Sequence, residues 1–142
     1  MKTFLKLFAA VFVFGFASAN AANTSEQKAA AIKAVTDAVA TGDATQIAAA
    51  VSEQVAKYPE LAGAIVQAGL KVTGVTSENQ TLIVRVAAWT APNNLSDIKS
   101  GIGKSGLPIK TIKSLMAVAV RVAAAAKDAG KARDVMPPIT AS

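Results

Sequence analysis

The sequence predicts an all-α fold, and three observations lead to that prediction. Alanine is abundant and only 5% of the residues are aromatic, a composition that favours helix and lets helices approach closely. Helix-breaking residues recur at near-regular intervals, at Gly42, Pro59, Gly74 and Pro92. The segments between them carry apolar residues at helical spacing. We therefore expect a single small domain of several short helices packed around one longer C-terminal helix.

The start of the chain predicts export. Two lysines precede an apolar run at 7–17, and the small-x-small pattern of a cleavage site follows at 19–21. The run is shorter than the roughly 20 apolar residues that span a bilayer, which argues against an uncleaved membrane anchor. We expect residues 1–21 to be a secretory signal peptide, cleaved after Ala21 or, as a second choice, after Ala19. The mature protein would then be periplasmic or secreted.

Residues 22–134 are expected to form the helical domain. Its first four segments are each long enough for about three helical turns, and they read AAAIKAVTDAVA, ATQIAAAVSEQVAKY, ELAGAIVQAGLKV and QTLIVRVAAW. Helices this short are marginal in water, so they must pack on one another. Isoleucines at comparable places, Ile32, Ile47 and Ile65, suggest an internal duplication of a helix-turn-helix unit.

Three of these helices have recognisable starts. Asp43 with Gln46, and Ser77 with Gln80, have the spacing of a capping box, in which two side chains satisfy otherwise unpaired backbone N–H groups. Pro59 fits the first position of a helix, where its missing N–H is not needed. We expect helices to begin at these three places.

The segment at 81–90, TLIVRVAAWT, admits two interpretations. Its β-branched residues are typical of a strand. A single strand would have no partner for its backbone hydrogen bonds, so we predict a helix. Trp89 is then expected to be the largest residue of the core. The alternative for Trp89 is an exposed aromatic ring that stacks on a sugar or a base.

A glycine-rich connector at 100–106 is expected to separate these segments from the longest helix. Pro108 would open that helix and Gly130 would end it, which gives about 22 residues. Its broad apolar arc predicts a central helix wrapped by the shorter ones. A helix lying on a membrane surface is the alternative, although such a helix has a wider charged face. The tail at 135–142 contains two prolines and is expected to be disordered.

Two short motifs resemble those of known catalytic or nucleotide-binding sites, and both are incomplete. The connector contains G-K-S, but Ile98 stands where a phosphate-binding loop needs its first glycine, so we expect no nucleotide. Ser96 and Lys99 match the S-x-x-K motif of penicillin-recognising enzymes, whereas the K-T-G element fails at Ile112. The other interpretation of this segment is a helix start with Asn94 as its N-cap.

The absence of two residue types excludes most catalytic chemistry. The chain has no histidine and no cysteine, so it cannot build a His/Cys zinc site or a nucleophile activated by histidine. A pair of carboxylates is the remaining route, but the acidic residues are scattered and no pair stands out. We expect no enzymatic activity, no catalytic residue, no cofactor and no metal.

Charge is distributed unevenly along the chain. Residues 22–80 carry a net charge of −2 and residues 81–142 a net charge of +6, which points to an anionic partner. Lys110, Lys113 and Arg121 lie within about 80° of one another on the long helix and are the candidate contact with that partner. Alternatively, they are ordinary solubilising residues at the edge of a buried helix. No aromatic residues interleave with the basic ones, which argues against nucleic acid.

These observations lead to one principal expectation about function and one alternative. The protein is expected to be an exported, non-catalytic interaction or structural module, with a protein or an anionic envelope component as its partner. The alternative is a cationic protein that binds a membrane or envelope surface. The sequence leaves the oligomeric state open.

Overall fold

The computed structural model describes residues 24–135, with side chains as far as residue 130. The predicted signal peptide at 1–21 and residues 136–142 of the predicted tail lie outside this range. By internal contacts the chain divides into two units, 1–30 and 31–142, and the boundary falls inside a helix. Within the described range, no helix has the length and apolarity needed to cross a membrane.

The all-α prediction is confirmed: over the described residues the chain is helical and contains no strand. The segment at 81–90 is helix, as predicted. The elements are α2 (Ser25–Thr41), α3 (Ala44–Lys57), the 3₁₀ helix η1 (Pro59–Leu61), α4 (Ala62–Leu70), α5 (Ser77–Thr90), the 3₁₀ helix η2 (Pro92–Asn94), α6 (Leu95–Gly103) and α7 (Ile109–Val135).

Two consecutive units of helices, α3-η1-α4 and α5-η2-α6, have the same layout. The isoleucines on which the predicted duplication rested are not counterparts in it, because Ile32 lies in α2 and Ile47 and Ile65 lie in different helices of one unit. The helices of the two units have identical lengths of 14, 3 and 9 residues, and every boundary in the second unit lies 33 residues after its counterpart. A proline opens each 3₁₀ turn, Pro59 in the first and Pro92 in the second. The residues before them share one backbone conformation, with φ −132 and ψ 70 at Tyr58 and φ −131 and ψ 66 at Ala91.

The connections between units are also repeated. Gly42, Gly74 and Gly106 have φ values of 75, 85 and 81, and they lie 32 residues apart along the chain. This left-handed conformation is open to glycine because glycine has no Cβ. Each of these glycines comes shortly before α3, α5 or α7, so the same turn starts the first helix of each unit.

The starts of α3 and α5 use side-chain caps at equivalent positions. The Asp43 carboxylate accepts hydrogen bonds from the backbone N–H groups of Thr45 at 2.9 Å and Gln46 at 3.4 Å, so Asp43 is the predicted cap. The reciprocal half of the predicted capping box is not formed, because the N–H of Asp43 donates to the Thr41 hydroxyl at 3.1 Å. In α5 the hydroxyl of Thr76 accepts from the N–H of Asn79 at 3.1 Å. The predicted cap at Ser77 is therefore wrong by one residue, because Ser77 is already helical.

The first turn of α2 has a capping box that the sequence analysis missed. The Thr24 hydroxyl accepts from the backbone N–H of Gln27 at 3.1 Å, and the Gln27 side-chain oxygen accepts from the N–H of Thr24 at 2.9 Å. The two side chains thus satisfy both backbone donors reciprocally, and this fixes where α2 begins.

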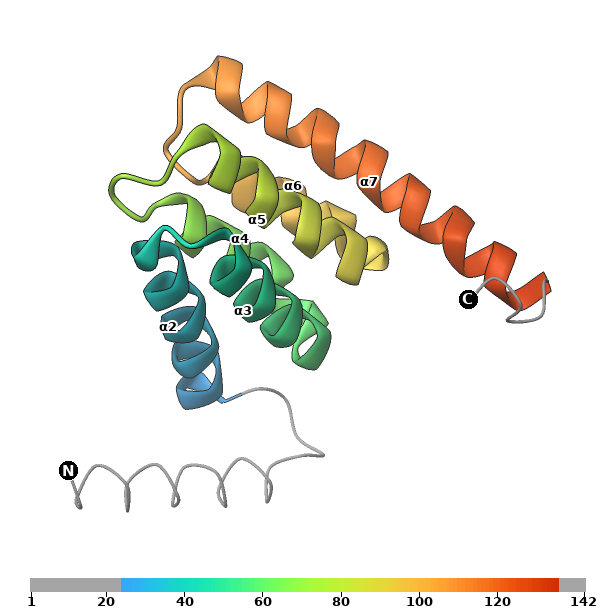
Figure 1. Cartoon of the computed structure of the whole chain (residues 1–142), viewed down its shortest axis with the longest axis horizontal. Helices are drawn as coiled ribbons and strands as arrows, with labels where there is room; N and C mark the ends of the chain where they lie inside the picture. The colour runs from blue at the N-terminus through green and yellow to red at the C-terminus, as the bar shows by residue number, and fades with distance from the viewer. Residues whose placement is uncertain (1–23, 136–142) are drawn as a thin grey trace. The chain divides into compact units, whose positions relative to one another are not determined.

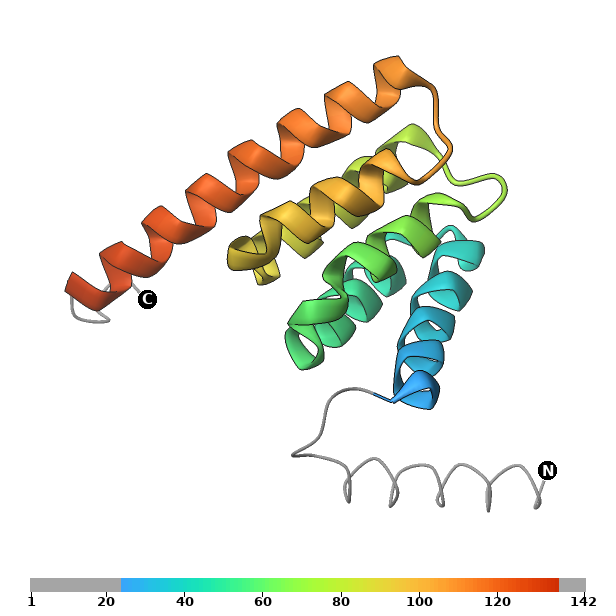
Figure 2. The ribbon, with the colours of Figure 1, turned by 180° about the vertical axis from the view of Figure 1, so that it is seen from behind.

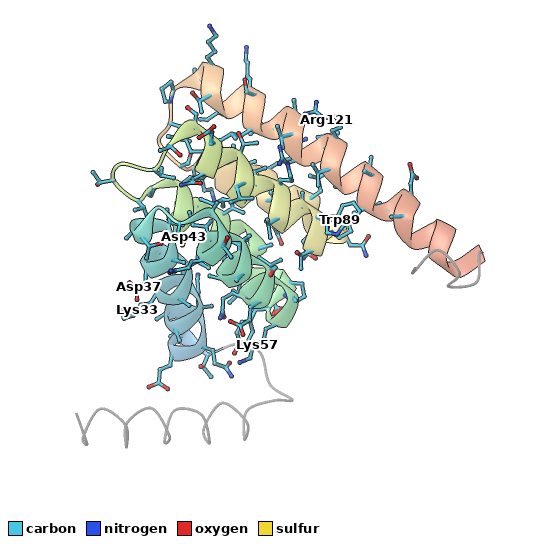
Figure 3. The ribbon with its side chains drawn as sticks, in the orientation of Figure 1. Lys33, Asp37, Asp43, Lys57, Trp89 and Arg121 are labelled. Atoms are coloured by element: carbon cyan, nitrogen blue, oxygen red, sulfur yellow. The ribbon has the colours of Figure 1, made fainter. Side chains whose placement is uncertain are left out.

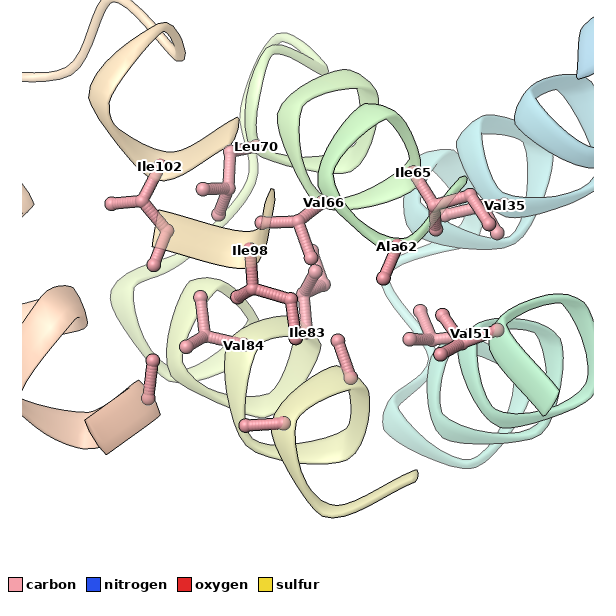
Figure 4. Packing of buried hydrophobic residues seen from close by; sticks show 14 of the residues in the cluster. Val35, Val51, Ala62, Ile65, Val66, Leu70, Ile83, Val84, Ile98 and Ile102 are labelled. Carbon is pink, nitrogen blue, oxygen red and sulfur yellow. The ribbon is translucent and has the colours of Figure 1, made fainter. Parts of the chain in front are cut away.

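Within the unit that starts at residue 31, the helices form two layers. The helices α3, α5 and α7 lie side by side in one layer, which faces the reader in Figure 1. The helices α4 and α6 pack against each other in the second layer, seen from behind in Figure 2. The second layer supplies Ile65 and the neighbouring helix α2 supplies Val35, and these side chains meet in the core (Figure 4).

The core between the layers is aliphatic. Its largest fully buried side chains include Ile47 and the four isoleucines labelled in Figure 4, which are Ile65, Ile83, Ile98 and Ile102. The predicted burial of Trp89 is wrong, because that side chain is 48% exposed. Near its C-terminal end α5 buries Ala87 and Ala88 instead, whose small side chains let the neighbouring helices approach closely.

The helices α4 and α6 cross with their backbones in contact. A Cβ atom added to Gly101 would overlap the carbonyl oxygen of Gly63, and one added to Gly63 would overlap the carbonyl oxygen of Asp97. The predicted connector at 100–106 therefore starts too early, since Gly101 lies inside α6 and serves a close approach. Helix α6 ends at Gly103, and the connector proper begins after it.

Helix α7 differs from expectation in length and in position. It continues through Gly130 to Val135, 27 residues or about 40 Å. It forms the edge of its layer rather than the centre of the domain (Figures 1 and 2). Only Leu115, Ala119 and Ala123 are buried among its described side chains. The broad apolar arc misled the prediction because its large side chains Ile109 and Val120 stay exposed, at 70% and 44%, and do not enter the core.

Helix α7 begins like a third unit and then departs from it. Residues 109–122 stand 32 residues after α5 and match its length. Ala124 occupies the place of Pro92, so no proline interrupts the helix. Residues 127–135 match α6 in length, but Gly130 stands where the earlier units have Ile65 and Ile98. The chain therefore runs straight where the earlier units turn back.

Candidate functional site

The candidate site is an open groove of about 500 Å³ on the layer formed by α3, α5 and α7. Helix α5 lies between the other two and contributes Arg85, Val86, Trp89 and Thr90. Figure 3 shows Trp89 near the end of α5, beside α7. The groove thus runs over the second half of α5, where the side chains that this helix turns into the core are the alanines Ala87 and Ala88.

The two flanking helices line the groove with small side chains. Helix α3 contributes Ala48, Ala49 and Ser52, and α7 contributes Val122 and Ala125. Such side chains occupy little volume, so they leave the groove open and allow the backbone of a bound molecule to come close. The lining is mostly apolar, and its polar groups are few.

The residues Arg85 and Trp89 give the groove its chemical character. They are four residues apart on α5, so they share one helical face, whereas Val84 and Ala88 turn into the core. The indole offers a large apolar surface and one N–H donor, and the guanidinium offers five donors for a carboxylate or phosphate. No acidic side chain lines the groove.

The three basic residues predicted as a contact differ in their distance from the groove. Lys110, Lys113 and Arg121 are all exposed on α7, and none forms an ion pair with another described side chain. Arg121 lies on α7 one helical turn before Ala125, which lines the groove, but Arg121 itself is not among the lining residues (Figure 3). Lys110 and Lys113 belong to the first turns of α7 and do not line the groove.

The residues of the two incomplete motifs, S-x-x-K and G-K-S, lie on α6 and in the turn that follows it. Ser96 and Lys99 are both exposed on α6, in the layer opposite the groove. The buried Ser105 hydroxyl donates to the carbonyl oxygen of Ile102 at 2.6 Å and accepts from the N–H of Leu107 at 3.4 Å, which closes the turn after α6.

Two further expectations concern Asn94 as an N-cap and the presence of a metal site. Asn94 occupies the N-cap position of α6, but its side chain makes no capping hydrogen bond. Over the part of the chain that the structure describes, no three acidic, histidine or cysteine side chains come together in a way that could hold a metal ion.

Sequence reasoning missed the groove because it arises between helices. It also assigned Trp89 to the core, although the helical periodicity held a usable signal. Val84 and Ala88 define the buried face of α5, and Arg85 and Trp89 each follow one of them by 100°. An arginine and a tryptophan on the same side face of a short helix indicate that this face is not fully buried.

Comparisons of the chain with protein-family models, with curated proteins and with solved structures found no match.

Proposed function

We propose that the protein is an exported, non-catalytic interaction module that binds a partner through the groove across α3, α5 and α7. Stacked helical units present continuous surfaces to a partner, and here the stack carries an open apolar groove. The lack of histidine and cysteine in the sequence removes most of the groups on which catalysis depends.

One observation carries this proposal: the single tryptophan of the chain lies in the groove, 48% exposed. Burying such a ring in the core would contribute to folding, whereas an exposed ring in an apolar groove gains contact area when a partner covers it. Tryptophan and arginine are also the residue types that dominate the energetics of protein interfaces.

A site-specific crosslinking experiment tests the proposal. A photo-crosslinking amino acid is placed at the groove residue Ala49 and, as a matched control, at Lys99 in the opposite layer. Irradiation in the native cell should give a discrete adduct from Ala49 that is absent from Lys99. A Trp89→Ala change in the same chain should abolish the adduct. Identical adducts from both positions, or none from Ala49, would count against an interaction module that uses this groove.

Export is the second part of the proposal, and it rests on residues 1–21 of the sequence. The protein should accumulate in the periplasm or the medium with its first 19 or 21 residues removed. Intact mass of the exported protein measures this directly. A soluble protein that retains Met1 would contradict it.

Binding to a membrane or envelope surface is a second candidate function. It is favoured by the three exposed cations of α7 and by Ile109, a 70% exposed apolar side chain next to Lys110. Vesicle flotation at two salt concentrations tests it. Changing Lys110, Lys113 and Arg121 to glutamine should then weaken salt-sensitive flotation on anionic vesicles.

The control for flotation changes Lys28, Lys33 and Lys57 to glutamine, so that the net charge falls by the same amount. Equal losses from the two triple variants would mean that only net charge matters and that α7 carries no contact site.

A further inference from the structure

We infer that the segment seated in this groove is an acidic amphipathic helix of a partner protein. The inference rests on the proposed function, because it names the kind of partner that the groove between α3 and α7 would take. The charge of the groove, its shape and its openness each support it.

Charge complementarity identifies the acidic side of the partner. Arg85 is the one ionisable residue in the groove lining, and Arg121 is exposed on α7 outside the lining, one turn before Ala125. Neither forms an ion pair with another described side chain. A carboxylate on the partner would meet the Arg85 guanidinium beside apolar walls that partly shield the pair from water, where such a pair is least weakened by salt.

The shape of the groove fits a helix. The helices α3 and α7 flank α5, and their groove-facing side chains are small at Ala48, Ala49 and Ala125. A fourth helix laid over α5 would pack as the helices of the layer already pack on one another, at interaxial distances of about 8 to 10 Å. Large side chains spaced i, i+3, i+4 and i+7 on that helix would enter the groove beside Trp89.

The openness of the groove argues for an amphipathic helix over a free lipid chain. Sites for small apolar ligands enclose most of the ligand surface. This groove leaves one side of its occupant in water, which suits a helix with one apolar and one polar face. We therefore treat binding of an isolated lipid as an outcome that would overturn the inference.

Two model peptides of about 15 residues provide the test. Both carry leucines at the i, i+3, i+4 and i+7 positions; one has glutamates beside the leucines and the other has lysines at the same places. Binding to the mature protein is measured by calorimetry and by the emission of Trp89, the only tryptophan. The glutamate peptide should bind and shift the emission to shorter wavelength, because the indole loses water. The lysine peptide should bind at least about tenfold more weakly.

Variants of the protein show which residues bind the glutamate peptide. Exchanging Arg85 and Arg121 for glutamine should weaken binding of the glutamate peptide about tenfold or more and reduce its salt dependence. The Lys99→Gln control removes an exposed cation from the opposite layer and should change the affinity less than about twofold. Ser52→Phe should fill the groove and abolish binding without a change of charge. Unchanged circular dichroism and thermal midpoints show that each variant is folded.

The outcomes separate this inference from the proposed function. Equal binding of both peptides, or an unaffected Arg85/Arg121 double variant, would overturn the acidic partner while the groove could remain the contact surface. A Trp89 response to anionic vesicles and to neither peptide would overturn the helical partner in favour of a lipid. Crosslinking from Ala49 that persists in either case would show that the proposed function stands without the inference.

Discussion

The unit α5-η2-α6 turns back on itself, whereas α7 starts in the same way and then runs straight. In the first case Pro92 follows the end of α5, and α6 brings Ile98 and Ile102 into the core. In the second case Ala124 stands in the proline's place and Gly130 in the place of Ile98. The comparison indicates that the return of the chain depends on two signals. One is a residue that ends the first helix, and the other is a set of apolar residues that stabilise the second helix against the layer.

Both signals have a plain physical basis. Proline removes a backbone donor and clashes with the preceding turn, so a helix ends there, while alanine is the best helix former. Buried isoleucines supply the free energy that holds the second helix against the layer. Residues 127–135, KDAGKARDV, contain no such side chain at the matching positions, so nothing favours a return.

The largest expected effect comes from placing a proline in each region. Ala88→Pro removes a backbone hydrogen bond from the last turn of α5 and disturbs a fully buried position, so we expect the loss of more than about 3 kcal/mol, which prevents stable folding. Ala124→Pro should end α7 early but leave the thermal midpoint of the domain nearly unchanged, because few contacts depend on the residues beyond it. Thermal unfolding followed by circular dichroism measures both. Equal losses would show that the second half of α7 is as integral as α5.

The next largest effect is expected at the crossing of α4 and α6. Gly101→Ala would drive a Cβ into the carbonyl of Gly63, and neither backbone can yield easily, so we expect a loss of about 3 kcal/mol in the free energy of unfolding. Urea denaturation gives this value. A loss below about 0.5 kcal/mol would mean that α4 and α6 separate at little cost and that the second layer is loosely packed.

A smaller effect is expected from the helix caps that the two repeated units share. Asp43→Ala and Thr76→Ala each remove a side-chain acceptor from a helix start, and each should lower the free energy of unfolding by about 1 kcal/mol. Similar losses in chemical denaturation would support the equivalence of α3 and α5. A clear loss from one variant and none from the other would contradict it.

The smallest effect is expected from a glycine in α7, which can be compared with the glycine at the crossing of α4 and α6. Gly130 lies inside α7, and a Cβ added there meets nothing within 4 Å. Gly130→Ala should therefore increase helix content slightly and stabilise α7 by about 0.5 to 1 kcal/mol locally, the reverse of Gly101→Ala. Amide hydrogen exchange in the second half of α7 measures this, since slower exchange is expected. Faster exchange would show that Gly130 serves a contact of its own.

Local features of the chain were determined by the sequence alone. The helical content, the cap at Asp43 and the turn at Pro59 follow from residue type and spacing. Each depends on interactions within a few residues, such as a side chain that caps a nearby N–H or a ring that fixes φ. That Lys110, Lys113 and Arg121 share one face of α7 follows in the same way, because one helix face is a local property.

The tertiary structure alone decided where those elements lie. Apolar periodicity predicts which face of a helix is buried but does not tell how many neighbours it has, so α7 was expected at the centre and lies at the edge. Gly101 has the pattern of a breaker and instead lets two helices touch. The groove, with Trp89 in it, arises from three helices whose contacts join residues far apart in the chain. Such contacts depend on which helices meet, and no local pattern in this sequence specifies that.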